Sequence, residues 1–245
     1  MYELHFDLTT DDGEMPTWVV RPDGPGPYPV VLFLMDAPGM RQEIRDMASR
    51  LATAGYYVMT SQQYYREVRE FNVFETGDRD RMFELMSNLS NEMVNRDAGS
   101  MIEYAAADDA ANADKVGVVG YCMSGPFAVM VAAAHSQVVA AGSFHGVALV
   151  ADADDSPHKH LDAINGEVYI GAAETDSYAP PEMINAFADA LEASSATGQV
   201  EWYPGTEHGF AYAERPQYDR AASERHWERM HDLFARNLNL SLIHI

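Results

Sequence analysis

The stretch Lys115-Val-Gly-Val-Val-Gly-Tyr-Cys-Met-Ser-Gly125 decides the fold of this chain. It begins as a short apolar run, typical of a buried strand, and ends in small residues around Cys122, the only cysteine. The run Phe127 to Ala134 follows at once and is typical of a helix. Small residues permit a sharp turn between the two elements. The stretch therefore predicts a strand, a tight turn and a helix with the thiol at the tip, the arrangement called a nucleophile elbow.

A thiol at that tip faces the N-terminus of the following helix. Unpaired N–H groups and the helix dipole favour an anion there, so they favour a thiolate. The same groups stabilise the oxyanion that forms when a carbonyl is attacked. The backbone N–H of Met123, one residue after the thiol, is the expected first donor. The competing interpretation makes Cys122 a small hydrophobic core residue.

The sequence also offers a base for the thiol and an acid to orient that base. Asp176 and His208 each lie just after a strand-like apolar run, Glu167–Ala172 and Gln199–Tyr203. Catalytic groups of open α/β sheets collect in loops of this kind. Asp176 could instead be a plain helix cap, and Glu174 is its rival as the orienting acid.

Strand and helix patterns alternate along the chain, which predicts an α/β fold with a mostly parallel central sheet and helices on both faces. We expect one domain over residues 1–245, with 238–245 as a frayed or non-native tail. After an opening hairpin, strands are expected at 30–35, 56–60, 115–121, 138–144, 167–172 and 199–203. Helices are expected at 41–54, 82–89, 97–111, 127–134, 181–194 and 218–237.

Residues 61–80 are irregular and rich in Tyr, Arg and Phe. A long excursion of this kind in a compact domain is often a cap or rim with a function. We therefore expect Tyr64, Tyr65 and Phe71 near the mouth of a pocket, although plain surface packing is an equal alternative.

The composition excludes several classes of protein. The net charge is −22, with 38 acidic and 16 basic residues, which argues against nucleic acid or an anionic membrane as partner. The chain has no long apolar run and no signal peptide, and one free thiol fits a cytoplasmic protein. His158 and His160 form a weak His-x-His pattern, so no metal site is expected. A monomer is the expected state.

The chain resembles the dienelactone hydrolase family, thiol members of the α/β-hydrolase fold, over roughly residues 15–238. The resemblance rests on five pieces that occur in order: Met35-Asp-Ala-Pro-Gly39, Gly120-Tyr-Cys-Met-Ser-Gly125, Ser143-Phe-His-Gly146, residues 171–180 and Glu207-His-Gly-Phe210.

The resemblance implies that Cys122 is the nucleophile, Asp176 the orienting acid and His208 the base. It also implies that Asp36 partners the resting thiol, at a position where the best-known members have Glu. The backbone N–H of Ala37 resembles the second oxyanion donor. The family needs no metal or organic cofactor.

Two departures from the family pattern matter. Ser124 replaces a glycine of the elbow. Tyr212 stands where the prototype has an arginine that grips a substrate carboxylate, and Arg81 matches another such arginine only loosely. Arg81 and Tyr212 are therefore candidates for substrate binding, but a preference for a carboxylate is not implied.

Together these features predict a hydrolase that cleaves a small-molecule lactone or carboxylic ester through a thioester acyl-enzyme. One alternative is a thiol redox sensor, against which the absence of a resolving cysteine counts. The other is a non-catalytic protein that binds a carbonyl ligand.

Overall fold

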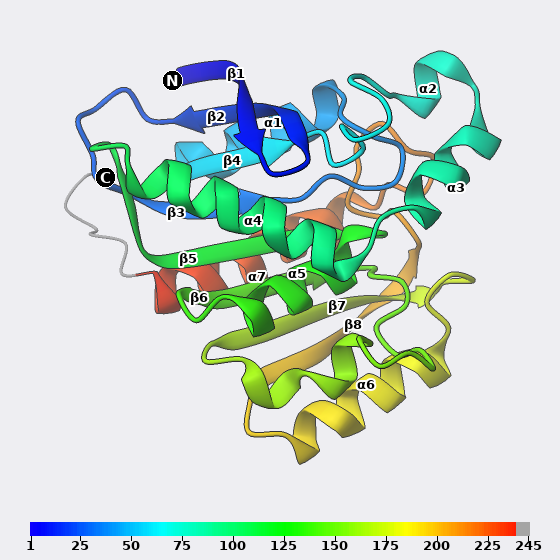
Figure 1. The fold of residues 1–245 in the computed structure, drawn as a ribbon. Coiled ribbons are helices and arrows are strands. Elements are labelled where there is room, and N and C mark those ends of the chain that lie inside the picture. The colour runs from blue at the N-terminus through cyan, green and yellow to red at the C-terminus, as the bar shows by residue number, and fades with distance from the viewer. Residues whose placement is uncertain (239–245) are drawn as a thin grey trace.

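An eight-stranded β-sheet runs through the centre of the molecule (Figure 1). The computed structural model describes residues 1–238. Its strands are β1 (Tyr2–Thr10), β2 (Gly13–Arg21), β3 (Tyr28–Phe33), β4 (Tyr57–Ser61), β5 (Ala111–Tyr121), β6 (Val138–Phe144), β7 (Glu167–Thr175) and β8 (Thr197–Glu207). Their order in the sheet is β1-β2-β4-β3-β5-β6-β7-β8. Only the β1–β2 and β2–β4 pairs are antiparallel, which confirms the predicted mostly parallel sheet.

Helices cover both faces of this sheet. They are α1 (Gln42–Thr53), α2 (Val73–Thr76), α3 (Arg79–Ser87), α4 (Asn91–Ala106), α5 (Ser124–Ala134), α6 (Pro181–Ala193) and α7 (Arg220–Asn237). Two 3-10 turns, Pro157–Lys159 and Leu161–Ala163, lie before β7. In Figure 1, α4 and α5 lie in front of the sheet and α1 and α7 lie behind it. The predicted tail at 238–245 lies outside the described residues except for Leu238, which is buried.

The central strands are buried along continuous runs. Every residue of β3 from Val30 to Phe33 and of β5 from Val116 to Tyr121 is buried. Such runs are typical of parallel strands that are covered on both faces. The carboxyl ends of parallel strands meet at one edge of the sheet, and the loops after β5, β7 and β8 therefore gather there.

Helix α4 begins six residues before its predicted start at Asp97, because Ser90 caps it. The Ser90 hydroxyl accepts the backbone N–H of Met93 at 3.2 Å, which satisfies one of the free donors of the first turn. Asp97 instead lies inside the helix and is buried. The helix ends at Ala106, and Ala111, which was predicted to be helical, is the first residue of β5.

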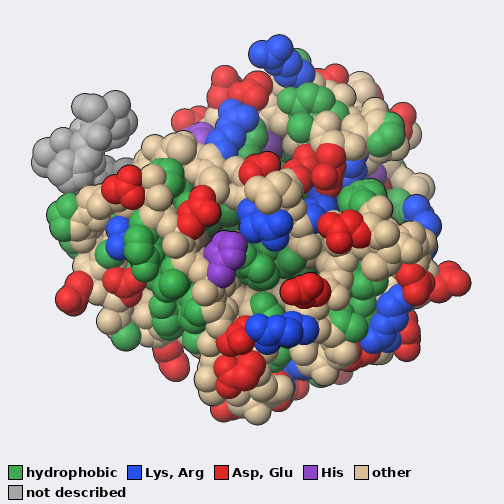
Figure 2. Space-filling view, turned by 90° about the horizontal axis from the view of Figure 1, so that it is seen from above, with side chains coloured by type: hydrophobic (Ala, Val, Ile, Leu, Met, Phe, Trp, Pro, Cys, Tyr) green, Lys and Arg blue, Asp and Glu red, His purple; other side chains and the backbone are tan. Residues whose placement is uncertain are grey.

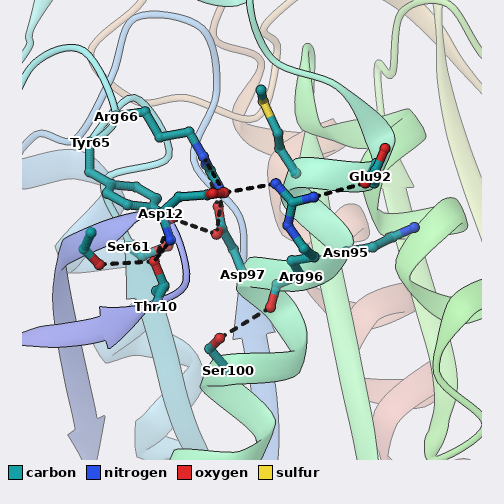
Figure 3. A network of polar contacts seen from close by, with 12 residues as sticks. Thr10, Asp12, Ser61, Tyr65, Arg66, Glu92, Asn95, Arg96, Asp97 and Ser100 are labelled. Atoms are coloured by element: carbon teal, nitrogen blue, oxygen red, sulfur yellow. Dashed lines mark hydrogen bonds and ion pairs between the residues drawn. The ribbon is translucent and has the colours of Figure 1, made fainter.

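A polar network explains why an acid is buried in that helix (Figure 3). Arg66 donates to Asp97 at 2.9 Å and to Asp12 at 2.7 Å, and the Tyr65 hydroxyl donates to Asp97 at 2.9 Å. Arg96 joins the network by donating to Asp12 at 2.8 Å. These contacts tie the turn between β1 and β2 to α4 and to the irregular segment that begins after β4.

Charged side chains of both signs share the surface. Figure 2 shows acidic and basic groups interspersed on one face. Some of these groups form exposed ion pairs, for example Arg69 with Asp7 at 2.7 Å. Within residues 1–238, no helix has the length and apolar character that a membrane span requires.

The elbow forms as the sequence predicts. Cys122 has a φ of 52°, in the left-handed region that most side chains avoid. Its backbone N–H donates to Phe144 at 3.1 Å, and its carbonyl oxygen accepts the N–H of Val147 at 3.1 Å. A Cβ on Gly120 would lie only 2.0 Å from the carbonyl oxygen of Ser124. The strand and the helix therefore meet at a distance that only glycine permits.

Substituting Gly120 with Ala tests this constraint. Because the added methyl would collide with backbone, we expect Gly120→Ala to destabilise the protein by more than about 2 kcal/mol, or to lower Tm by roughly 5 °C or more. Gly142→Ala is the matched control, since its Cβ would meet side-chain atoms at an ordinary 3.5 Å. Equal thermal melts for the two variants would contradict the argument.

Candidate active site

Cys122 opens into a cavity of about 390 Å³ at the carboxyl edge of the sheet. His208 lines the same cavity, so the structure brings the predicted nucleophile and the predicted base together. The other lining residues are Ala37, Pro38, Val73, Phe74, Arg79, Met82, Phe83, Met86, Val147, Ala148, Tyr178, Met183 and Arg215. A cavity of this size is typical of a small-molecule site.

Asp176 holds the His208 ring. The Nδ1 of His208 lies 2.7 Å from Oδ2 of Asp176, which is buried. The second carboxylate oxygen accepts the backbone N–H groups of Tyr178 and Ala179 at 2.8 and 3.1 Å. Glu174, the rival acid, is exposed and accepts the N–H of Gly205 at 2.6 Å. Of the two acids, Asp176 is therefore the one in contact with the imidazole.

The environment of His208 favours its protonated form. Burial lowers the pKa of the ring, but the hydrogen bond with Asp176 and the nearby Cys122 thiol together outweigh burial and raise the pKa to about 9. The charge interactions with the same two groups act in the same direction. The ring is therefore held by the carboxylate in the cavity that contains the thiol, and it is suited to hold and transfer a proton.

Two backbone donors are free beside the thiol. The N–H groups of Ala37 and Met123 donate to no acceptor within residues 1–238. Both residues are fixed by Tyr64, whose hydroxyl donates to the Ala37 carbonyl at 2.9 Å and lies 3.2 Å from the Met123 sulfur. The Ser124 hydroxyl donates to the carbonyl of Met35. Unpaired, rigidly held N–H groups are the kind of donor that stabilises an oxyanion.

Asp36 lies behind this loop and binds two arginines. Its carboxylate is fully buried and accepts from Arg41 and, at 2.6 Å, from Arg215. Arg41 also pairs with Glu43 and Glu214. Burial and the hydrogen bond with Glu214 raise the pKa of Glu43 to about 7. The role of Asp36 as thiol partner stays a prediction, because the contacts of its carboxylate go to guanidinium groups.

A model of the dienelactone hydrolase family matches residues 15–238. The chain belongs to the dienelactone hydrolase family. Among its relatives is a "Putative carboxymethylenebutenolidase" of Yersinia pestis, 26% identical over 94% of this chain and 86% of the relative. A relative of the same name from Salmonella typhi is 28% identical over 94% and 85% of the two chains. A solved structure described as a putative dienelactone hydrolase from Klebsiella pneumoniae has a TM-score of 0.88 and 25% identity, covering 96% of this chain and 98% of its own.

The arginines of this family member are arranged differently from the sequence-based prediction. Arg81 does not line the cavity and pairs with Glu67 and Glu84. Tyr212 does not line the cavity either and is fully buried. Arg79 and Arg215 line the cavity instead. Sequence spacing could not identify them, because Arg79 and Arg81 lie on one short helix and only the fold decides which of them faces the cavity.

The three aromatic residues expected at the pocket mouth do not line this cavity. Tyr64 is buried behind Ala37, and Tyr65 belongs to the network around Asp97. Phe71 lines a different cavity, of about 680 Å³. The first part of the irregular segment, up to Phe71, therefore lies behind the site. Its second part forms α2 and the start of α3, and Val73, Phe74 and Arg79 in it line the cavity.

Sequence reasoning gave no role to His145, although it lies against His208. The two ring centroids are 4.8 Å apart in an edge-to-face arrangement, and His145 has a φ of 39°. Within the described chain its ring nitrogens have no hydrogen-bond partner. Burial and the charge of His208 hold the pKa of His145 well below its usual value. A neutral ring therefore packs beside His208 and adds no competing charge.

No group of three His, Cys, Asp or Glu side chains in the described residues could hold a metal ion. The His-x-His pattern is engaged elsewhere: His158 hydrogen-bonds with Ser156 at 2.9 Å, and His160 lies 3.0 Å from the carbonyl of Asp154.

Substituting Asp176 with Asn tests the assignment of the orienting acid. The change removes the charge that raises the pKa of His208, so we expect kcat/KM for an activated ester to fall about 100-fold. The alkaline limb of the pH–rate profile, expected near a pH of about 9, should move to lower pH because the imidazolium loses its proton more easily.

Glu174→Gln is the matched control for Asp176→Asn and should leave the alkaline limb of the pH–rate profile unchanged.

The raised pKa of His208 also stabilises the folded state. This contribution is fully present below the unfolded-state pKa of about 6.5. This contribution is lost as the pH rises through about 9, so the Tm difference between wild type and Asp176→Asn should shrink over that range. If Glu174→Gln shifted the alkaline limb of the pH–rate profile, the assignment of Asp176 as the orienting acid would be wrong.

Asp36→Asn distinguishes a structural acid from a thiol partner. Leaving Arg41 and Arg215 without their shared carboxylate should cost about 3–5 kcal/mol of stability. If the carboxylate only binds the arginines, Asp36→Asn should change the rate of Cys122 alkylation by iodoacetamide less than Asp176→Asn does. A larger change in alkylation rate for Asp36→Asn would support the thiol-partner role.

Proposed function

We propose that the protein hydrolyses a carboxylic ester or lactone through a thioester acyl-enzyme on Cys122. The observation that carries the proposal is that Cys122 and His208 line one cavity while the His208 ring contacts the buried Asp176 carboxylate at 2.7 Å. This is the arrangement that nucleophilic catalysis requires: a nucleophile, a base and a group that orients the base.

The acylation step uses groups that line the cavity. The Cys122 thiolate attacks the carbonyl carbon, and the carbonyl oxygen becomes an oxyanion. The free N–H groups of Ala37 and Met123 stabilise it, and one such donor typically lowers a barrier by about 3–4 kcal/mol. Protonated His208 gives its proton to the leaving oxygen as the C–O bond breaks, which leaves a thioester and a neutral imidazole.

The deacylation step reverses these roles. Neutral His208 takes a proton from water, and the resulting hydroxide attacks the thioester carbonyl. The C–S bond breaks, the carboxylic acid leaves, and the proton on His208 again faces the thiolate. When the substrate is a lactone, the leaving alkoxide stays attached to the acyl group, so the product is a hydroxy acid.

The Asp36 contacts bear on how the thiol is activated. In the family, the acid at this position partners the resting thiol. Here its carboxylate accepts from Arg41 and Arg215, whereas His208 lines the same cavity as the thiol. These contacts support a resting site in which the imidazole already serves as the partner of the thiol.

Cys122→Ala tests the proposed nucleophile. We expect turnover of p-nitrophenyl acetate and of an enol lactone to fall by about 1,000-fold or more, because no other group can form the acyl intermediate. Cys122→Ser should retain the fold and lose much of the rate. Intact-mass analysis of the wild type during turnover should detect one acyl group on the only cysteine.

Full turnover by Cys122→Ala would refute the proposal. Stoichiometric sulfenate formation by peroxide without ester turnover would indicate the redox alternative. Ligand-induced stabilisation without product would indicate a binding protein.

A further inference from the structure

We infer that the site is selective for uncharged esters or lactones that carry an apolar alkyl or aryl group next to the scissile bond. The group would lie against α2 and α3. This inference rests on the proposed hydrolysis at Cys122 and specifies its substrate class.

The strongest observation is where the exposed apolar side chains lie. In the described part of the chain, five large hydrophobic residues are exposed: Met1, Tyr2, Phe74, Phe83 and Tyr178. The last three are exposed by 58%, 41% and 53%, and all three line the Cys122 cavity. Exposed apolar surface gathered at one place is typical of a binding site.

The charge of the lining points the same way. The protein has 38 acidic residues, yet none of the residues that line this cavity is acidic. Arg215 lies in the lining, but its guanidinium is paired with Asp36 at 2.6 Å. Arg79 is on the exposed first turn of α3, where solvent and salt screen its charge. His208 also lines the cavity and is paired with Asp176, so the remaining lining residues carry no charge and offer mainly apolar contacts.

The wall formed by α2 and α3 is suited to a variable apolar group. It contributes Val73, Phe74, Met82, Phe83 and Met86. Methionine side chains are flexible and polarisable, so they adapt to ligands of different shape. Figure 1 shows α2 and α3 set apart from the helices that pack on the sheet. Within α3 only Met82 and Leu85 are buried, so much of this helix is available to the ligand.

The larger cavity of about 680 Å³ provides an internal contrast. Its lining mixes Asp7, Arg45, Arg69, Glu70 and Glu75 with apolar residues, and it contains neither Cys122 nor His208. The absence of acidic side chains from the lining therefore distinguishes the cavity that holds the thiol from this larger cavity.

Two substrate series test the inference. In the first, p-nitrophenyl acetate, butyrate, hexanoate and octanoate vary the acyl group and keep the leaving group constant. In the second, γ-lactones with lengthening alkyl substituents vary the alcohol side. We expect kcat/KM to rise about three- to fourfold per buried methylene in at least one series. The series that responds identifies the side of the ester that contacts α2 and α3.

A carboxylated substrate and two variants sharpen the test. The p-nitrophenyl monoester of adipic acid has the length of the hexanoate and a terminal carboxylate, and it should react at least about tenfold more slowly because the cavity would desolvate its charge. Phe83→Ala should lose more rate as the chain lengthens. Tyr2→Ala, which removes an exposed aromatic residue outside the cavity, should match the wild type.

The two proposals fail in different ways. Acetate turnover that depends on Cys122, with no rise along either series or with faster cleavage of the adipate monoester, would overturn the apolar selectivity and leave the proposed function intact. Absence of any turnover that depends on Cys122 would overturn the proposed function. A chain-length response that Phe83→Ala leaves unchanged would overturn the assignment to α2 and α3.

Discussion

The close approach of β5 and α5 at Gly120 is the constraint on which the site depends. Because the Ser124 carbonyl lies where a Cβ would stand, the chain can reverse within a few residues. The reversal places Cys122 in a left-handed conformation, with a strain of about 1–3 kcal/mol. Hydrogen bonds from the Cys122 backbone to Phe144 and Val147 hold it there. The sheet thus stabilises an otherwise unfavourable position of the thiol.

A second constraint joins segments that are far apart in the sequence. Ala37 belongs to the loop after β3, whereas His208 belongs to the loop after β8. The Asp36 carboxylate lies next to Ala37 and binds Arg215, which lies seven residues beyond His208. Because the Asp36 carboxylate is fully buried, this ion pair fixes the loop that contains Ala37 relative to the segment after β8 that contains His208 and Arg215. Within the described residues, the side-chain contacts of the Asp36 carboxylate are all with Arg41 and Arg215.

The local parts of this structure were predictable from sequence, and the long-range parts were not. The elbow was predictable because small residues around Cys122 determine the turn locally. The predicted start of α4 at Asp97 was wrong because Ser90 caps the helix earlier, and Asp97 lies buried inside it, where a tertiary contact with Arg66 holds it. Whether Arg79 or Arg81 lines the cavity depends on how α3 packs against the rest of the molecule. His145 carried no signal of its own, because its contact with His208 joins two separate strand ends.

The apolar cavity and the acidic composition lead to the same expectation about substrates. A net charge of −22 repels anions at long range, and this repulsion weakens as salt screens it. An anionic substrate would then need a free cation inside the site. Arg215 is already neutralised by Asp36, and Arg79 lies at the exposed rim. Long-range electrostatics and local lining therefore both favour an uncharged, apolar ester over a carboxylated one.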